Sequence, residues 1–223
     1  MSQEAFDNFL KLLERACESA GRKKTEIELL PVSKGQGVAK IKEFLLLDKF
    51  PQQLAENYLA ELSEKEEALP QIQWHYQGAL QSRKLEEILK HASVLQSVSR
   101  EKELLLVKKI NPEKLKGFYL QVNISSEGQK LGASQNEVKH LLDVITKEGL
   151  DSLFLGFMGI ASELGGVVSE STVREQFSSL RNFRDKVSPS SKLSMGMSSD
   201  FHLAIAEGAD LVRVGSLLFG ERK

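Results

Sequence analysis

The sequence predicts an α/β fold, a single-domain (β/α)8 barrel of the TIM type with an additional N-terminal helix. Two observations lead to this prediction. Short apolar runs typical of strands alternate with segments of helical periodicity along the whole chain. Strands separated by helix-length segments must pair mainly in parallel, and eight such units close naturally into a barrel.

The first element is a helix ahead of the first strand. Its apolar residues recur at steps of three and four and so share one face; they are Phe6, Phe9, Leu10, Leu13, Ala16 and Cys17. We expect this helix to pack on the outside of the barrel.

Eight apolar runs then follow in turn, each with the length and composition of a buried parallel strand. We expect strands over residues 27–34, 53–56, 72–76, 93–98, 117–124, 153–160, 192–195 and 210–215. We expect helices between them over residues 38–45, 58–69, 83–91, 100–110, 134–149, 172–187 and 199–208.

Two of these helices carry capping signals. Ser134 with Glu137, and Thr172 with Glu175, have the spacing of a capping box, and Gly149 is a plausible C-terminal stop. An open doubly wound sheet is the alternative architecture. The first strand is not followed by the G-x-G-x-x-G turn that would support it.

Composition restricts the class of protein. The 30 Lys and Arg residues balance 31 Asp and Glu residues, so no global field attracts nucleic acid or an anionic membrane. Cys17 is the sole cysteine, which excludes a disulfide within the chain and favours the cytoplasm. No apolar stretch approaches the ~20 residues that cross a bilayer. We expect residues 1–223 to form one soluble domain whose partners are small molecules or protein surfaces.

Ligands of such barrels bind at the C-terminal ends of the strands. The residues expected there are Lys34, Asn57, His75, Asn123, Met158, Met195 and Arg213. Lys34 follows LLPVS, so its amine can reach over the mouth of the barrel as a nucleophile. The alternative is a solvated loop lysine, because most lysines are exposed.

The segments SMGMSSD and RVGS form a second group of candidates. Barrels of this kind often bind phosphate at the last two strand-to-helix loops, where backbone amides and hydroxyls favour an anion. The residues concerned are Ser198, Ser199, Gly215 and Ser216, together with the first amides of the helix after SMGMSS. Ordinary turns with a helix cap are an equally good interpretation on the sequence alone.

Other polar residues remain ambiguous. Arg213 lies on a strand expected to be buried, so it needs an acceptor, either a ligand atom or an internal ion pair. His75 is an acid–base candidate or a hydrogen-bonded packing residue. We expect Glu56 and Glu61 to be rim or solvent groups. Three histidines lack metal-ligand spacing, so no metal is expected; they are His91, His140 and His202.

Seven segments together resemble the pyridoxal phosphate (PLP) homeostasis family, whose members are related to the barrel domain of alanine racemase. The segments are PVSK at Lys34, ENY from Glu56, WHYQGALQSRK from Trp74, QVNISSEGQKLG from Gln121, GFMGI from Gly156, LSMGMSSDFHLAI from Leu193 and VRVGSLLFGER from Val212. They extend over almost the whole chain.

This resemblance implies a cofactor and roles for the candidates. PLP would form a Schiff base with Lys34, and Arg213 would face its pyridine nitrogen. Its phosphate would bind Ser198, Ser199, Gly215 and Ser216, while Asn57, His75 and Met195 would line the ring or its surroundings. The chain departs from the family pattern at Leu54 and Ala55, which replace Phe-Gly, and at Ala79 and Arg83, which replace His and Asn.

The function implied is intracellular PLP (vitamin B6) homeostasis with effects on amino-acid pools, without strong catalytic activity, in which the protein passes PLP to apo-enzymes. We expect a monomer, because the second domain of alanine racemase is absent. The alternative is a PLP-dependent amino-acid racemase of low activity. Racemisation needs acid–base groups on both faces of the substrate, and Lys34 serves only one. Tyr58 and Tyr76 near the rim carry no sign of the second role.

Overall fold

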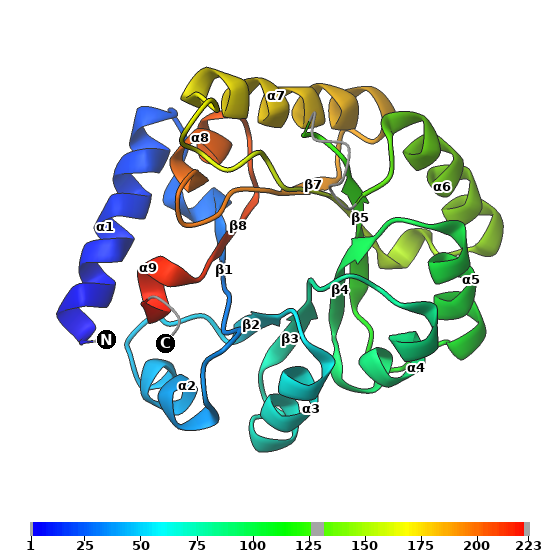
Figure 1. The fold of residues 1–223 in the computed structure, drawn as a ribbon, viewed down its shortest axis with the longest axis horizontal. Helices are drawn as coiled ribbons and strands as arrows, with labels where there is room; N and C mark the ends of the chain where they lie inside the picture. Colours follow the sequence, from blue (N-terminus) through cyan, green and yellow to red (C-terminus); the bar gives the residue numbers. More distant parts are fainter. Residues whose placement is uncertain (1, 126–131, 221–223) are drawn as a thin grey trace.

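The structure is a computed structural model that describes residues 2–125 and 132–220. Eight parallel strands form a ring with helices around it, as Figure 1 shows, which confirms the predicted barrel. The strands are β1 (Glu28–Pro31), β2 (Gln53–Glu56), β3 (Gln73–Tyr76), β4 (Val94–Val98), β5 (Gly117–Val122), β6 (Phe154–Gly159), β7 (Lys192–Ser194) and β8 (Leu211–Val214).

The sheet order runs β1-β8-β7-β6-β5-β4-β3-β2, so closure depends on the contact between β1 and β2. Val32 and Ala55 form a parallel bridge there. The Ser33 amide donates to the Ala55 carbonyl at 3.0 Å, and the Gln53 side chain donates to the Leu29 carbonyl at 3.0 Å. These contacts close the ring.

The first eight helices follow the expected alternation, and the short helix after β8 was not predicted. The helices are α1 (Gln3–Ser19), α2 (Val38–Leu45), α3 (Leu59–Ala68), α4 (Ser82–His91), α5 (Glu101–Ile110), α6 (Gln135–Glu148), α7 (Glu170–Val187), α8 (Phe201–Ala206) and α9 (Ser216–Phe219). Helix α1 lies outside the ring beside α8, as predicted, with the Phe9 and Phe201 rings 6.1 Å apart. In the described part of the chain no helix has both the length and the apolar character needed to cross a membrane.

The two predicted caps have different outcomes. The Glu137 amide donates to the Ser134 hydroxyl at 3.3 Å, and Gly149 ends α6 at φ 66°, so the cap of α6 is confirmed. The cap of α7 is wrong. Ser169, whose hydroxyl accepts from the Thr172 amide at 3.3 Å, caps this helix three residues before the predicted cap Thr172. Both residues have a hydroxyl suited to capping, and the chain becomes helical at the earlier one.

Residues inside the ring differ from those between the strands and helices. The strand residues that face the helices are apolar and join the main core, including Trp74, Phe118 and Phe157. The opposite face of the strands carries apolar and polar side chains, among them Leu211 and Arg213, which alternate with the core residue Val212. The interior of the ring is therefore partly hydrogen-bonded.

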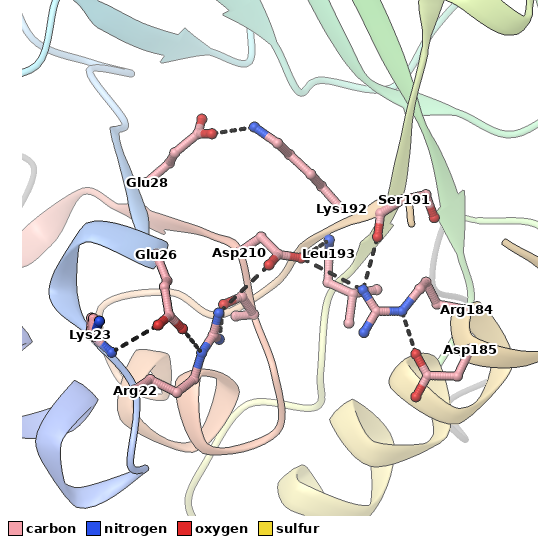
Figure 2. Close-up of polar contacts among 11 residues, drawn as sticks. Arg22, Lys23, Glu26, Glu28, Arg184, Asp185, Ser191, Lys192, Leu193 and Asp210 are labelled. Atoms are coloured by element: carbon pink, nitrogen blue, oxygen red, sulfur yellow. Dashed lines mark hydrogen bonds and ion pairs between the residues drawn. The ribbon is translucent and has the colours of Figure 1, made fainter. Parts of the chain in front are cut away.

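A network of ion pairs covers the N-terminal end of the barrel, where β1, β7 and β8 begin. Figure 2 shows Arg22 and Arg184 approaching the Asp210 carboxylate from opposite sides, at 3.6 and 3.8 Å. The same carboxylate accepts from the Leu193 amide at 2.7 Å. The Asp210 carboxylate at this end is thus compensated by two arginines.

Candidate cofactor site

A cavity of about 470 Å³ opens at the C-terminal ends of the strands, where ligands of such barrels bind. Six of the predicted residues line it: Lys34, Ser198, Ser199, Arg213, Gly215 and Ser216. Arg213 lies on β8 and the other five follow β1, β7 and β8, so residues about 180 positions apart in the sequence meet in one place. A second hollow, of about 550 Å³, lies on the outer helices along α7, away from the strand ends.

Lys34 lies in the turn after the first strand. Strand β1 ends at Pro31, Val32 forms the bridge to β2, and the turn follows, so this strand is shorter than predicted. Gly35 takes a φ of 74°, a left-handed conformation that glycine adopts without steric cost. The turn leaves Lys34 half-buried in the cavity wall.

The two loops expected to bind phosphate contact each other. The Ser198 hydroxyl accepts from the Gly215 amide at 3.2 Å and from the Leu217 amide at 3.5 Å. Gly196 has a φ of 91°, and a Cβ at this position would lie 2.6 Å from the Ala204 side chain, so the first loop needs glycine. Helix α8 begins at Phe201, which does not line the cavity, so the expected contribution of its first amides stays a prediction. Residues of α9 line the cavity.

Arg213 lies between the cavity and the interior of the ring, with 3% of its surface exposed. It donates to the Ser194 carbonyl at 2.7 Å, to the Ser194 hydroxyl at 2.9 Å and to the Gly159 carbonyl at 2.9 Å. Burial lowers the pKa of Arg213 to about 10, and the charges of Asp200 and Tyr119 oppose this shift. These acceptors are neutral, and within the described residues Arg213 has no carboxylate in ion-pair contact.

The other three predicted binding residues lie outside the cavity lining, and so do Asn123 and Met158, which were expected at strand ends. His75 is buried inside the ring, where its Nδ1 lies 3.0 Å from the Gln96 side chain and burial lowers its pKa to about 3. This is the packing position that one of the two interpretations expected. Met195 is fully buried in the core. Asn57 reaches the site indirectly, since it accepts from Gln77, a residue of the lining, at 3.0 Å.

A hydrogen-bonded chain connects His75 to the site. Gln96 contacts His75, and its carbonyl oxygen accepts from the Ser194 hydroxyl at 2.8 Å. Ser194 in turn accepts from Arg213. The guanidinium is therefore held from the interior of the ring.

Several residues of the lining were not predicted: Val32, Gln36, Gln77, Glu163, Met197, Phe219 and Gly220. Met197 belongs to the same SMGMSS segment as Met195 and had an equal sequence signal. Glu56 also differs from expectation. It is fully buried rather than at a solvated rim, and its Oε1 lies 2.6 Å from the Lys65 ammonium.

Comparison with known proteins agrees with this architecture. The profile of the family described as "Alanine racemase, N-terminal domain" matches residues 10–223, which defines the chain as a barrel of that class. The pyridoxal phosphate homeostasis protein of Aquifex aeolicus is 34% identical over 232 residues, covering 99% of this chain and 98% of the relative. The chain therefore belongs to the pyridoxal phosphate homeostasis protein family.

Solved structures show the same fold. PipY of Synechococcus elongatus PCC7942, solved with PLP bound, is 27% identical with a TM-score of 0.72, over 93% of this chain and 99% of PipY. Alanine racemase of Clostridium difficile 630 is 15% identical with a TM-score of 0.69, over 95% of this chain and 56% of that enzyme. At this identity the racemase shares the fold alone. Residues 126–131 and 221–222, parts of two segments that carried the resemblance, lie outside the described residues.

Proposed function

We propose that this chain binds PLP as a Schiff base on Lys34 and acts in intracellular PLP homeostasis, with effects on amino-acid pools. The observation that carries the proposal is the convergence of Lys34, Arg213 and the hydroxyl-bearing loops in one cavity. The names of its relatives and the PLP-bound PipY support the choice of ligand.

The chemistry of the lining fits PLP. A lysine amine condenses with the PLP aldehyde, forming a C=N bond with the release of one water molecule. The hydroxyls of Ser198, Ser199 and Ser216, together with Gly215, offer a polar cup for its phosphate. PLP itself supplies an electron sink when bound.

Arg213 limits that electron sink. Facing the pyridine nitrogen, its permanent positive charge would disfavour protonation of the ring. An unprotonated ring withdraws electrons weakly, so the site suits holding the cofactor better than stabilising carbanions. We assign His75 the task of orienting Arg213 through Gln96 and Ser194, Asn57 that of orienting Gln77, and Met195 that of packing beneath the site.

A low-activity amino-acid racemase is the alternative for the same site. It needs a second acid–base group opposite Lys34. Tyr76 is buried and Tyr58 is exposed, and neither lines the cavity. A racemisation assay with D- and L-amino acids separates the two functions. We further propose that the chain acts in the cytoplasm as a monomer and passes PLP to apo-enzymes.

The visible spectrum of the protein with added PLP tests the proposal. We expect a band near ~420 nm, typical of a protonated lysine imine, that borohydride reduction removes by fixing the adduct. Lys34→Ala should lack this band and keep its thermal unfolding temperature. A wild-type protein without any band or covalent adduct would contradict the assignment of PLP.

A further inference from the structure

A buried ionic cluster lies behind the turn that carries Lys34. It consists of Glu56 at the end of β2 and of Glu61 and Lys65 on α3. The Lys65 side chain is 3% exposed, and its Nζ lies 2.6 Å from Glu56 Oε1 and 2.7 Å from Glu61 Oε2. A lysine ammonium has three N–H donors, and Lys65 also donates to the Ser33 carbonyl at 2.9 Å. All three N–H donors of the Lys65 ammonium therefore have an acceptor.

The cluster holds the backbone on both sides of Lys34. On the preceding side, the Ser33 carbonyl accepts from Lys65, and its hydroxyl donates to Glu56 Oε1 at 2.6 Å. On the following side, the Gly35 amide donates to Glu61 Oε2 at 2.7 Å. The two peptide segments that flank Lys34 are thus tied to the same ion-paired cluster.

Stability alone does not explain such a cluster. Removing charges from water is costly, and apolar residues of similar size stabilise a core as well or better. The second carboxylate oxygen of Glu56 is buried and has no hydrogen-bond partner among the described residues. Buried polar atoms without partners are rare, so their retention calls for another role.

We propose that Glu61 and Lys65 are positioning residues for Lys34. The lysine stem is long and flexible, so the volume that its amine samples depends on how firmly its Cα is held. A fixed turn keeps the amine within reach of an aldehyde bound in the cavity, which raises the rate of condensation. This inference rests on the proposed function, because it presupposes that Lys34 forms an imine with PLP. Glu61 and Lys65 do not line the cavity and would act only through Lys34.

Substitution of Glu61 tests the inference, since its side chain is 29% exposed whereas those of Glu56 and Lys65 are almost fully buried. Glu61→Ala removes the acceptor of the Gly35 amide, whereas Glu61→Gln keeps an oxygen at that place. Glu64→Ala, an exposed position on the same helix, is the matched control. The full-length variants are mixed with PLP, and the rate of appearance of the imine band is measured. Hydrogen exchange of residues 33–36 is followed without PLP.

We expect Glu61→Ala to slow imine formation by about tenfold and to speed exchange at residues 33–36. Glu61→Gln should restore most of the rate, and Glu64→Ala should behave as wild type. A Glu61→Ala variant with the wild-type rate and yield would overturn the inference alone. A wild-type protein that forms no imine would overturn the proposed function and the inference with it.

Discussion

Two buried or half-buried charges, Asp210 at the N-terminal end of the barrel and Arg213 at the cavity of the C-terminal end, are partnered in opposite ways. At the N-terminal end, Asp210 contacts Arg22 and Arg184 and accepts from a backbone amide, so opposite charges compensate one another (Figure 2). At the C-terminal end, Arg213 is held by two carbonyls and a hydroxyl, all neutral. The first arrangement stabilises the fold. The second leaves positive charge and hydroxyl donors at a cavity, which is what an anionic ligand requires.

The largest expected effect is electrostatic, at the C-terminal end. Ser216→Glu should weaken PLP binding by at least about 100-fold, because a carboxylate beside the phosphate costs several kcal/mol. Ser216→Gln, similar in size and uncharged, should bind far more tightly than Ser216→Glu. Titration of PLP followed by absorbance measures both dissociation constants. Pyridoxal, which lacks the phosphate, should bind both variants alike. Equal PLP affinities of Ser216→Glu and Ser216→Gln would show that the phosphate does not bind at this loop.

At the N-terminal end, substitution should affect stability alone. Asp210→Asn should lower the free energy of unfolding by about 1.5–3 kcal/mol, the usual range for hydrogen bonds to a charged group. Asp185→Asn is the control, since that carboxylate pairs with Arg184 at the surface, 51% exposed, and should cost less than about 1 kcal/mol. Urea unfolding measures both. A loss of PLP affinity in Asp210→Asn without loss of stability would contradict the division between the two ends.

Between the two ends, His75 should make stability depend on pH. Burial lowers its folded pKa to about 3 from the ordinary 6.5, so between these values the unfolded chain binds more protons. Stability must therefore fall as pH falls through this window, by at most about 2 kcal/mol from pH 7 to pH 5.

Urea unfolding of wild type and His75→Gln at several pH values isolates this contribution. The glutamine variant should lose less stability on acidification. Identical slopes for the two proteins would show that His75 is protonated in the folded chain.

Periodicity was sufficient for most of the fold. The alternation of strands and helices predicted the order and number of the barrel units, since parallel pairing leaves few alternatives. The error at the start of α7 arose because Ser169 and Thr172 both suit a cap, and local sequence does not choose between them. The end of β1 was placed too late because Val32 continues the apolar run after the regular strand has ended at Pro31.

The site was predictable where the strand-end rule applies directly, as at Lys34 and Arg213. It was not predictable where loop conformation decides. The left-handed Gly196 turns the chain between Met195, which is buried, and Met197, which lines the cavity. Burial of Glu56 depends on its ion pair with Lys65, which lies on the next helix. The i,i+4 spacing of Glu61 and Lys65 predicts their own ion pair but not the pair with Glu56. Contacts of this kind require the tertiary structure.

The most direct measurement is the location of the adduct. The wild-type protein is incubated with PLP, reduced with borohydride and digested, and the modified peptide is identified by mass spectrometry. We predict that the pyridoxyl group is attached to Lys34 and that Lys34→Ala acquires no specific label. A label on a lysine outside the cavity, or spread over surface lysines and unchanged in the variant, would contradict the assignment of the C-terminal end as the PLP site.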